Sequence, residues 1–399
     1  MLFNSSEYGT SASIMGKVTE YQSLHCRTCS DWLHMEIRRF DEMIYSIRIV
    51  IDQLPILVCD RCSKNYLPWL SQTMIREIVH ATKEKNALIG KFSRKNQSSR
   101  RFDYCIQANF MYDYRDYDFI PGLVRPWNDG YLTPVYFRKK VLLKYFHDPK
   151  FSVDFATDTY GSIYSGQSHM IAFGINRNGK VVVWLGDLDK LSKSEQMYFR
   201  SHNVRSDHNI ASGFYLSQIE AQFGVLSMED ALLKSRSDFH RACIQKFSFK
   251  LYRDGSDIDK VMSRVTRPII WNEKGISETI NNLNKICVEA VNVSGLKIQV
   301  LKVDPNFNFK TLGGLKLLEH WIRLKMPQLD SKKLMTPFFV LYDLRKIIVH
   351  LIVVKARRDT INFCKSRLNL LPDDKGYEKV YVKLLTRMSE SYRKLTASC

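Results

Sequence analysis

Four cysteines in the first part of the chain have the spacing of a metal site. Cys26 and Cys29 form one C-x-x-C pair, and Cys59 and Cys62 form a second pair after 29 intervening residues. Each pair places two thiolates at one tight turn, and two such turns complete the tetrahedral coordination of a zinc ion. Because four thiolates leave no open coordination position, the sequence predicts a structural Zn²⁺ site, with free thiols or a redox pair as the alternatives.

The segment between the two cysteine pairs must bring them together. It exceeds the usual spacer of such sites, so the sequence predicts an insertion between the two turns. A helix over residues 36–51 could fill it, because apolar residues recur along one side at Ile37, Phe40, Met43, Ile44 and Ile47. His25 and His34 lie close by in the sequence, but four thiolates need no further ligand.

An arginine and a histidine near the C-terminus form a second candidate site. Residues 339–351 read FVLYDLRKIIVHL, in which Arg345 stands five positions before His350. None of the other nine histidines has an arginine at this spacing. A guanidinium can stabilise charge on a phosphate, and an imidazole can move protons near neutral pH. The alternative is that Arg345 extends from an amphipathic helix and His350 is a hydrogen-bonded core residue.

Arg345 and His350, preceded by Leu344 in a helical segment, resemble the R-x4–6-H signature of the HEPN superfamily. These helical domains occur in many prokaryotic defence and toxin ribonucleases. The resemblance covers about residues 270–399, and Lys346 stands where the family often has a small polar residue. It implies that Arg345 and His350 are catalytic and that RNA is the substrate. It also implies a homodimer in which two motifs share a cleft, since residues five apart lie about 140° apart around a helix.

Two further groups of side chains could carry chemistry. A metal site of oxygen and nitrogen ligands could form in the middle of the chain, or these residues could end strands and cap a helix; they are Asp187, Asp189, His202, Asp207 and His208. An aromatic cluster in a strand-like stretch over 104–119 could stack nucleic-acid bases or fill a sheet core; its members are Tyr104, Phe110, Tyr112, Tyr114 and Tyr117.

Charge is distributed unevenly along the 399 residues. The net charge is +19, and residues 241–399 hold 30 Lys/Arg against 15 Asp/Glu. A basic surface attracts nucleic acid or an anionic membrane by long-range electrostatics. The alternative is that these charges only form a solvated face. Neither a run of apolar residues long enough to span a membrane nor a signal-peptide pattern is present. We therefore expect a cytoplasmic protein that does not enter a membrane, in which the nine cysteines are thiols or metal ligands.

The elements that position these groups divide into three segments. We expect an α+β protein with a zinc-ribbon-like N-terminal module (1–90), a mixed α/β central domain (102–250) and an all-helical C-terminal bundle (270–399), the first two joined by a basic linker over 91–101. In the centre, a hairpin of 168–175 and 180–185 turns at Asn176–Gly179, and Ser206-Asp207 could cap a helix over 208–223. The bundle contains helices over 276–291, 312–325, 337–354 (starting at Pro337) and 376–395.

Together these features predict a metal-independent endoribonuclease of the HEPN type that acts in anti-phage defence or as a regulated toxin. In this interpretation the first two segments restrain the nuclease or sense a trigger, which could be phage-derived. Two other functions are open. One is a non-catalytic zinc-containing adaptor that binds nucleic acid, and the other is a dimeric interaction scaffold; a steep dependence of binding on salt distinguishes the first from the second.

Overall fold

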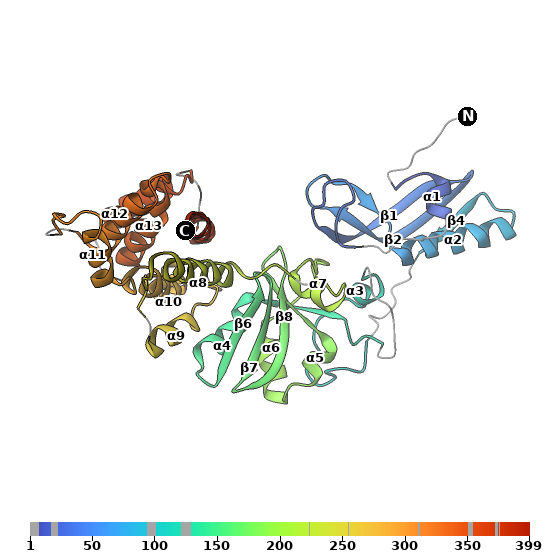
Figure 1. Ribbon diagram of the computed structural model, residues 1–399. Coiled ribbons are helices and arrows are strands. Elements are labelled where there is room, and N and C mark those ends of the chain that lie inside the picture. Colours follow the sequence, from blue (N-terminus) through green and yellow to red (C-terminus); the bar gives the residue numbers. More distant parts are fainter. Residues whose placement is uncertain are drawn as a thin grey trace. The chain divides into compact units, whose positions relative to one another are not determined.

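The computed structural model describes residues 8–16, 23–93, 101–120, 129–222, 224–253, 255–309, 312–349, 354–371, 374 and 376–399. The chain divides into two compact units, residues 1–225 and 226–399 (Figure 1). The first unit contains both sheets, and the second is helical. The fold is therefore mixed α/β with a helical C-terminal region and a cysteine cluster in its first 62 residues.

The first unit begins with a four-stranded sheet built around a long hairpin. The elements of this part are α1 (Ser11–Met15), β1 (Leu33–Ile44), β2 (Ile47–Cys59), β3 (Asn65–Tyr66), α2 (Trp69–Glu84) and β4 (Ile89–Phe92). β1 and β3 pair with β2 in the antiparallel sense, and β4 pairs with it in parallel. α2 packs on β2 and β4, with Ile75 and Val79 buried against the sheet.

The predicted helix over 36–51 is wrong, because this segment forms the β1–β2 hairpin. A bulge between Arg38 and Phe40 shifts the alternation of buried residues, and a turn at Tyr45 and Ser46 interrupts it again. Apolar residues therefore recur at intervals of three and four, which imitates a helical period.

The remainder of the first unit contains a six-stranded antiparallel sheet of order β10-β5-β9-β8-β7-β6. Figure 1 shows its strands β6, β7 and β8 side by side. Its strands are β5 (Pro134–Arg138), β6 (Phe151–Thr157), β7 (Tyr160–Ser165), β8 (Ser168–Ile175), β9 (Lys180–Trp184) and β10 (Asn203–Val204). Its helices are α3 (Tyr114–Asp118), the 3₁₀ turn η1 (Lys139–Leu142), α4 (Leu143–His147), α5 (Leu185–Asp189), α6 (Lys193–His202) and α7 (Gly213–Gln218). The β8–β9 hairpin confirms the prediction from sequence, with Gly179 at φ +74° in its turn.

Two predictions for this region are wrong. The stretch 104–119 forms no strand, and its only regular element is α3. Within it Phe110 and Tyr117 are buried in packing contacts, as the core interpretation of the aromatic cluster requires. The helix expected over 208–223 is shortened to α7, which Ser212 caps instead of Ser206-Asp207, because the Ser206 hydroxyl binds Asp116. Of the predicted linker, residues 94–100 lie outside the described residues, and Lys91 and Phe92 belong to β4.

The cysteine-bearing hairpin and the six-stranded sheet share one apolar core. Leu33, Met35 and Leu57 of the hairpin pack in the same cluster as Tyr136 and Trp184 of the sheet. In addition, the Met35 N–H donates to the His208 carbonyl at 3.2 Å. The first two predicted segments are therefore packed together within one unit.

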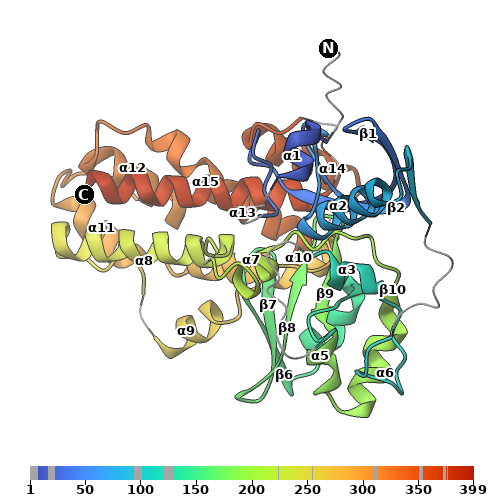
Figure 2. The same cartoon turned by 90° about the vertical axis from the view of Figure 1, so that its right-hand side faces the viewer.

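The second unit consists of helices. They are α8 (Met228–Phe247), α9 (Ser256–Met262), α10 (Glu273–Asn284), the π-helical turn η2 (Lys285–Glu289), α11 (Val293–Leu301), α12 (Gly314–Lys325), α13 (Ser331–Val349), α14 (Val354–Arg367) and α15 (Tyr377–Ser398). Helical structure is present with shifted bounds at all four positions predicted within 270–399, and residues 350–353 of the predicted 337–354 helix lie outside the described residues. α8, which lies in the predicted central segment, belongs to this unit and packs alongside α15 (Figure 2).

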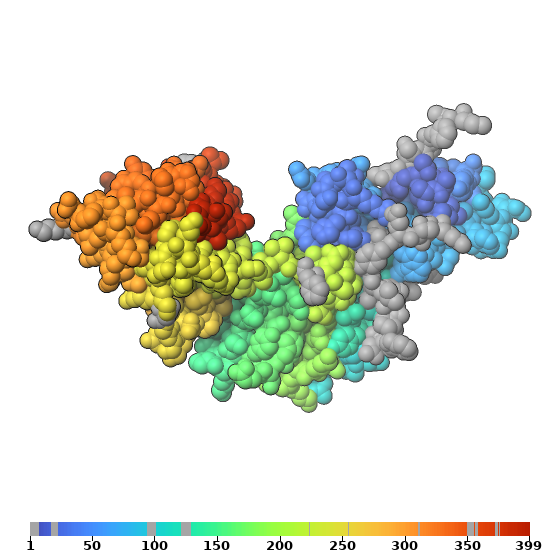
Figure 3. Space-filling view, in the orientation of Figure 1, coloured from blue at the N-terminus to red at the C-terminus, as the bar shows by residue number. Residues whose placement is uncertain are grey.

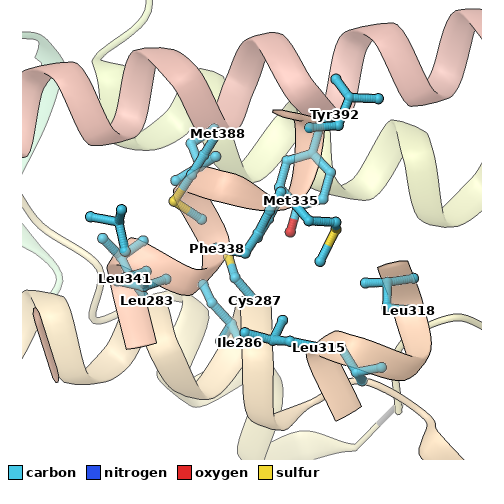
Figure 4. Close-up of a cluster of buried hydrophobic side chains, with 14 of the residues drawn as sticks. Leu283, Ile286, Cys287, Leu315, Leu318, Met335, Phe338, Leu341, Met388 and Tyr392 are labelled. Atoms are coloured by element: carbon cyan, nitrogen blue, oxygen red, sulfur yellow. The ribbon is translucent and has the colours of Figure 1, made fainter. Parts of the chain in front are cut away.

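α13 is the central helix of this unit and contacts α10, α12, α14 and α15. Its apolar side faces the cluster in Figure 4, where Met335, Phe338 and Leu341 meet Leu283 of α10 and Met388 of α15. The helix begins six residues before Pro337, so the prediction that Pro337 starts it is wrong. The Asp330 carboxylate accepts the Lys333 N–H at 3.0 Å and supplies the cap.

Among the described residues, none of the helices combines the length and the apolar character needed to cross a membrane.

Candidate metal centre and the C-terminal arginine

The four predicted cysteines lie together at the base of the β1–β2 hairpin. All four Sγ atoms lie within 4.8 Å of one another. The Cys29 and Cys59 sulfurs are 3.4 Å apart, and the Cys26–Cys62 and Cys29–Cys62 pairs are both 3.6 Å apart. Four sulfurs about 2.3 Å from one ion would be about 3.8 Å apart in a tetrahedron. The cluster therefore has the donor set and nearly the dimensions of a single metal site.

The two cysteine turns have the same backbone geometry. Ser30 and Ser63 follow the two pairs with φ of +57° and +55°. The Ser30 N–H donates to the Cys26 carbonyl at 2.8 Å, and the Ser63 N–H donates to the Cys59 carbonyl at 3.1 Å. This repeated turn aims both sulfurs of a pair to one side, as a shared ion requires.

The electrostatics of the cluster favour a cation at its centre. Burial raises the pKa of Cys26, but hydrogen bonds from the Tyr66 hydroxyl and from backbone N–H groups of the turn lower it further, to about 6. The Tyr66 hydroxyl lies 3.1 Å from the Cys26 sulfur. The backbone N–H of Asp31 lowers the pKa of Cys29, but burial and the neighbouring thiols raise it to about 12. A bound cation would stabilise all the thiolates at once and remove this conflict.

None of the nine cysteines, all of which are among the described residues, forms a disulfide. The two C-x-x-C pairs are therefore reduced thiols in this structure.

The turns are tied to the six-stranded sheet by charged side chains. The Arg177 guanidinium, in the β8–β9 turn, donates at 2.8 Å to both Asp31 and Asp60, which lie beside the two cysteine pairs. Asp60 also contacts His34 Nδ1 at 2.6 Å. His25 stacks on Trp32, with ring centroids 4.4 Å apart. Neither histidine belongs to the sulfur cluster.

The alternative metal site in the middle of the chain does not form. Asp187 accepts hydrogen bonds from Tyr131 and Lys190, and Asp189 accepts the Cys105 N–H at 2.6 Å. The remaining candidates also have separate contacts: Asp207 with Asn176, His208 with Asp116, and His202 with Tyr198. The sulfur cluster is the only grouping of three or more potential ligands within the part of the chain that the structure describes.

Arg345 lies on α13 directly after the buried Leu344, and its side chain is 28% exposed. One guanidinium nitrogen is 3.9 Å from Glu289, whose carboxylate also accepts the Asn284 amide at 2.7 Å. His350 comes directly after Val349 in the sequence and lies outside the described residues.

Asp343 is the acidic residue two positions before Arg345 in the sequence. Its carboxylate lies 3.5 Å from Arg367 of α14. Burial raises the pKa of Asp343, although Arg367 and Lys346 oppose that rise. Asp343 therefore links α13 to α14.

Several supporting residues were not found from sequence. Tyr66, Arg177 and Glu289 lie 40 residues or more from the groups they contact, which are Cys26, the cysteine turns and Arg345. The sequence carries one repeated local signal for the cysteine turns, which is the serine directly after each C-x-x-C pair.

Comparison of the chain with protein-family models, with curated proteins and with solved structures found no match.

Proposed function

We propose that the helical unit is a metal-independent endoribonuclease of the HEPN type, with Arg345 and His350 as its catalytic residues. The observation that supports this best is the position of Arg345, which follows the buried Leu344 and has a partly exposed side chain. The unit that carries it has 32 Lys/Arg against 18 Asp/Glu, so its field attracts a polyanionic substrate.

The chemistry follows from the two side chains. The ribose 2′-hydroxyl attacks the adjacent phosphate, and His350 takes up the proton or returns it to the leaving oxygen. Arg345 stabilises the charge that develops on the phosphorus-bound oxygens. Glu289 orients the guanidinium until the substrate binds. Two copies of the chain form a dimer that pairs the motifs in one cleft.

The sulfur cluster has a different role in this proposal. Cys26, Cys29, Cys59 and Cys62 hold one structural Zn²⁺, which fixes the zinc-ribbon-like turns beneath the β1–β2 hairpin. Four cysteine ligands leave the ion no position for substrate, so its role is to stabilise the fold. The unit of residues 1–225 restrains the nuclease or senses a trigger.

The decisive experiment measures RNA cleavage by the purified full chain in EDTA, with zinc content determined before and after. We expect the wild type to cut, and Arg345→Ala and His350→Ala to lose at least about 100-fold in rate, as removal of a charge-stabilising or proton-transferring group does. Lys346→Ala, an exposed neighbour on α13, serves as the matched control and should cut normally.

If the wild type is inactive in vitro, the same four proteins are compared for toxicity or phage protection in cells. Equal behaviour of all four there would refute the catalytic proposal. Salt-dependent RNA binding without cleavage in either setting would favour the second candidate, an adaptor that binds nucleic acid. The charge excess of residues 226–399 is the observation that supports this candidate.

A further inference from the structure

Two hollows flank the first turn of α13, and both contain cations. The hollow between α13 and α12 has a volume of about 280 Å³ and is lined by Lys316, Arg323 and Lys332. The hollow between α13 and α15 has a volume of about 170 Å³ and is lined by Lys333, Arg387 and Lys394. We call these six residues the α13 basic surface; α12 and α13 are orange and α15 is red in Figure 3.

Most of these cations have no acidic partner. Lys332, Lys333, Arg387 and Lys394 form no ion pair with any residue that the structure describes. Lys316 pairs with Glu319 at 3.1 Å. The other carboxylates that line the hollows are Asp330 and Glu390, so six cations face three anions. Gathering unpaired charge of one sign in a concave surface raises the local potential and attracts the opposite charge.

The orientation of α13 adds to this potential. The N-terminal end of a 19-residue helix carries a positive partial charge, where acidic residues are normally favoured. α13 has no acidic residue in its first turn and has Lys332 and Lys333 there instead. The capping carboxylate of Asp330 compensates part of this charge. An anion bound in the hollows would do so.

The wall of the larger hollow contains a hydrogen-bond donor that is not used. His320 stacks on Phe307 with ring centroids 4.1 Å apart, and its Nδ1 lies 2.7 Å from Arg323, which can only donate. The proton of the neutral ring is therefore on Nε2, which is buried and has no hydrogen-bond partner among the described residues. A polar ligand in the hollow could satisfy this donor after a small shift of the ring.

From these contacts we infer that the α13 basic surface binds consecutive phosphate groups of an RNA backbone. Recessed cations suit phosphates that project from a strand better than they suit a flat membrane surface. The inference rests on the proposed function, because RNA is taken as the ligand. Lys332 and Arg345 are 13 residues apart on one helix, about 20 Å along its axis. This surface is therefore separate from Arg345.

The test compares two full-length variants whose net charge is reduced by the same amount. The surface variant is Arg323→Gln/Lys332→Gln/Lys333→Gln. The matched control is Lys234→Gln/Lys260→Gln/Lys274→Gln, which removes three exposed lysines of α8, α9 and α10 that line neither hollow. Binding of a labelled single-stranded RNA is measured over a range of salt concentrations, and each variant is first shown to unfold at the wild-type temperature.

We expect the surface variant to bind about 10- to 100-fold more weakly at low salt than the wild type. The slope of log affinity against log salt should fall by about 0.7 for each phosphate that the protein no longer neutralises, or about 2 in total. The control should retain the wild-type slope. Equal weakening of both variants would overturn the inference and leave only a diffuse charge effect. Binding of the same proteins to anionic vesicles is measured in parallel. If the surface variant loses vesicle binding but binds RNA as the wild type does, the inference is also overturned.

The same proteins separate this inference from the proposed function. If Arg345→Ala abolishes cleavage while the surface variant binds and cuts normally, the nuclease stands and the surface assignment fails. If the surface variant alone loses affinity for RNA and the wild type never cuts, the surface assignment is supported and the nuclease proposal is refuted.

Discussion

The pair Asp116 and His208 is the clearest titratable contact outside the sulfur cluster. Asp116 is 3% exposed, and its carboxylate lies 2.6 Å from His208 Nδ1 and 2.6 Å from the Ser206 hydroxyl. Burial lowers the pKa of His208, but the hydrogen bond and the negative charge of Asp116 outweigh it, so the pKa is raised overall. His208 has φ +56°, so a strained backbone and an ion pair coincide at one residue.

This pair predicts a pH-dependent stability of the first unit. Since the folded state raises the pKa of His208, the stabilisation is complete below the unfolded value of about 6.5 and is lost as pH rises through the folded value. The unfolding temperature of this unit should therefore fall as pH rises above the unfolded value of about 6.5. His208→Gln should flatten that dependence and cost about 2 kcal/mol at low pH, because it leaves a buried carboxylate without its partner.

His80→Gln is the control, since His80 is 76% exposed on α2. Calorimetry across the pH range measures both variants. An unchanged pH profile in His208→Gln would contradict the assignment.

Sequence predicted the residues that are close in the chain and missed those that are distant. The C-x-x-C spacing identified Cys26, Cys29, Cys59 and Cys62 because metal coordination restricts local spacing. Asp116 and His208 are 92 residues apart, and no local period connects them. Their contact depends on the packing of α3 beside residues 206–208, which come from distant parts of the chain.

At the scale of elements, the β1–β2 hairpin shows why periodicity alone was misleading. The strand pairing runs from Leu33 and Cys59 to Ile44 and Ile47, but one bulge changes which residues face the core. Helices without bulges or turns within them were located correctly, as in α12 and α15. A hydrophobic period therefore identifies a strand only where the pairing is regular.

The hairpin turn offers a test of backbone strain. Tyr45 and Ser46 both have positive φ, +46° and +69°, which is the pattern of a type I′ turn. Ser46→Gly should stabilise the first unit by about 0.5–1 kcal/mol, because glycine adopts this conformation without steric cost.

Ser46→Ala keeps a Cβ atom at this position and should give no such gain. Chemical denaturation of the three proteins measures the difference. Equal stability of Ser46→Gly and Ser46→Ala would show that the turn is not strained.

At the scale of the molecule, two compact units predict two unfolding transitions. Metal analysis should give about one Zn per chain, the stoichiometry of a four-cysteine site. A strong chelator should lower the unfolding temperature of the first unit only, since the cluster lies within residues 26–62. Cys59→Ser should reproduce this effect.

Cys105→Ala, a substitution in the same unit away from the cluster, should keep its zinc. A zinc-free protein whose first transition is insensitive to chelator would refute the metal site.

The order of the two units along the chain also fixes the order in which they are made. Synthesis proceeds from the N-terminus at about 5–20 residues per second, so residues 226–399 are completed roughly 10–35 s after the first unit. The cysteine turns can acquire metal and pack on the six-stranded sheet during that interval. Synthesis of the first unit is thus complete before Arg345 leaves the ribosome.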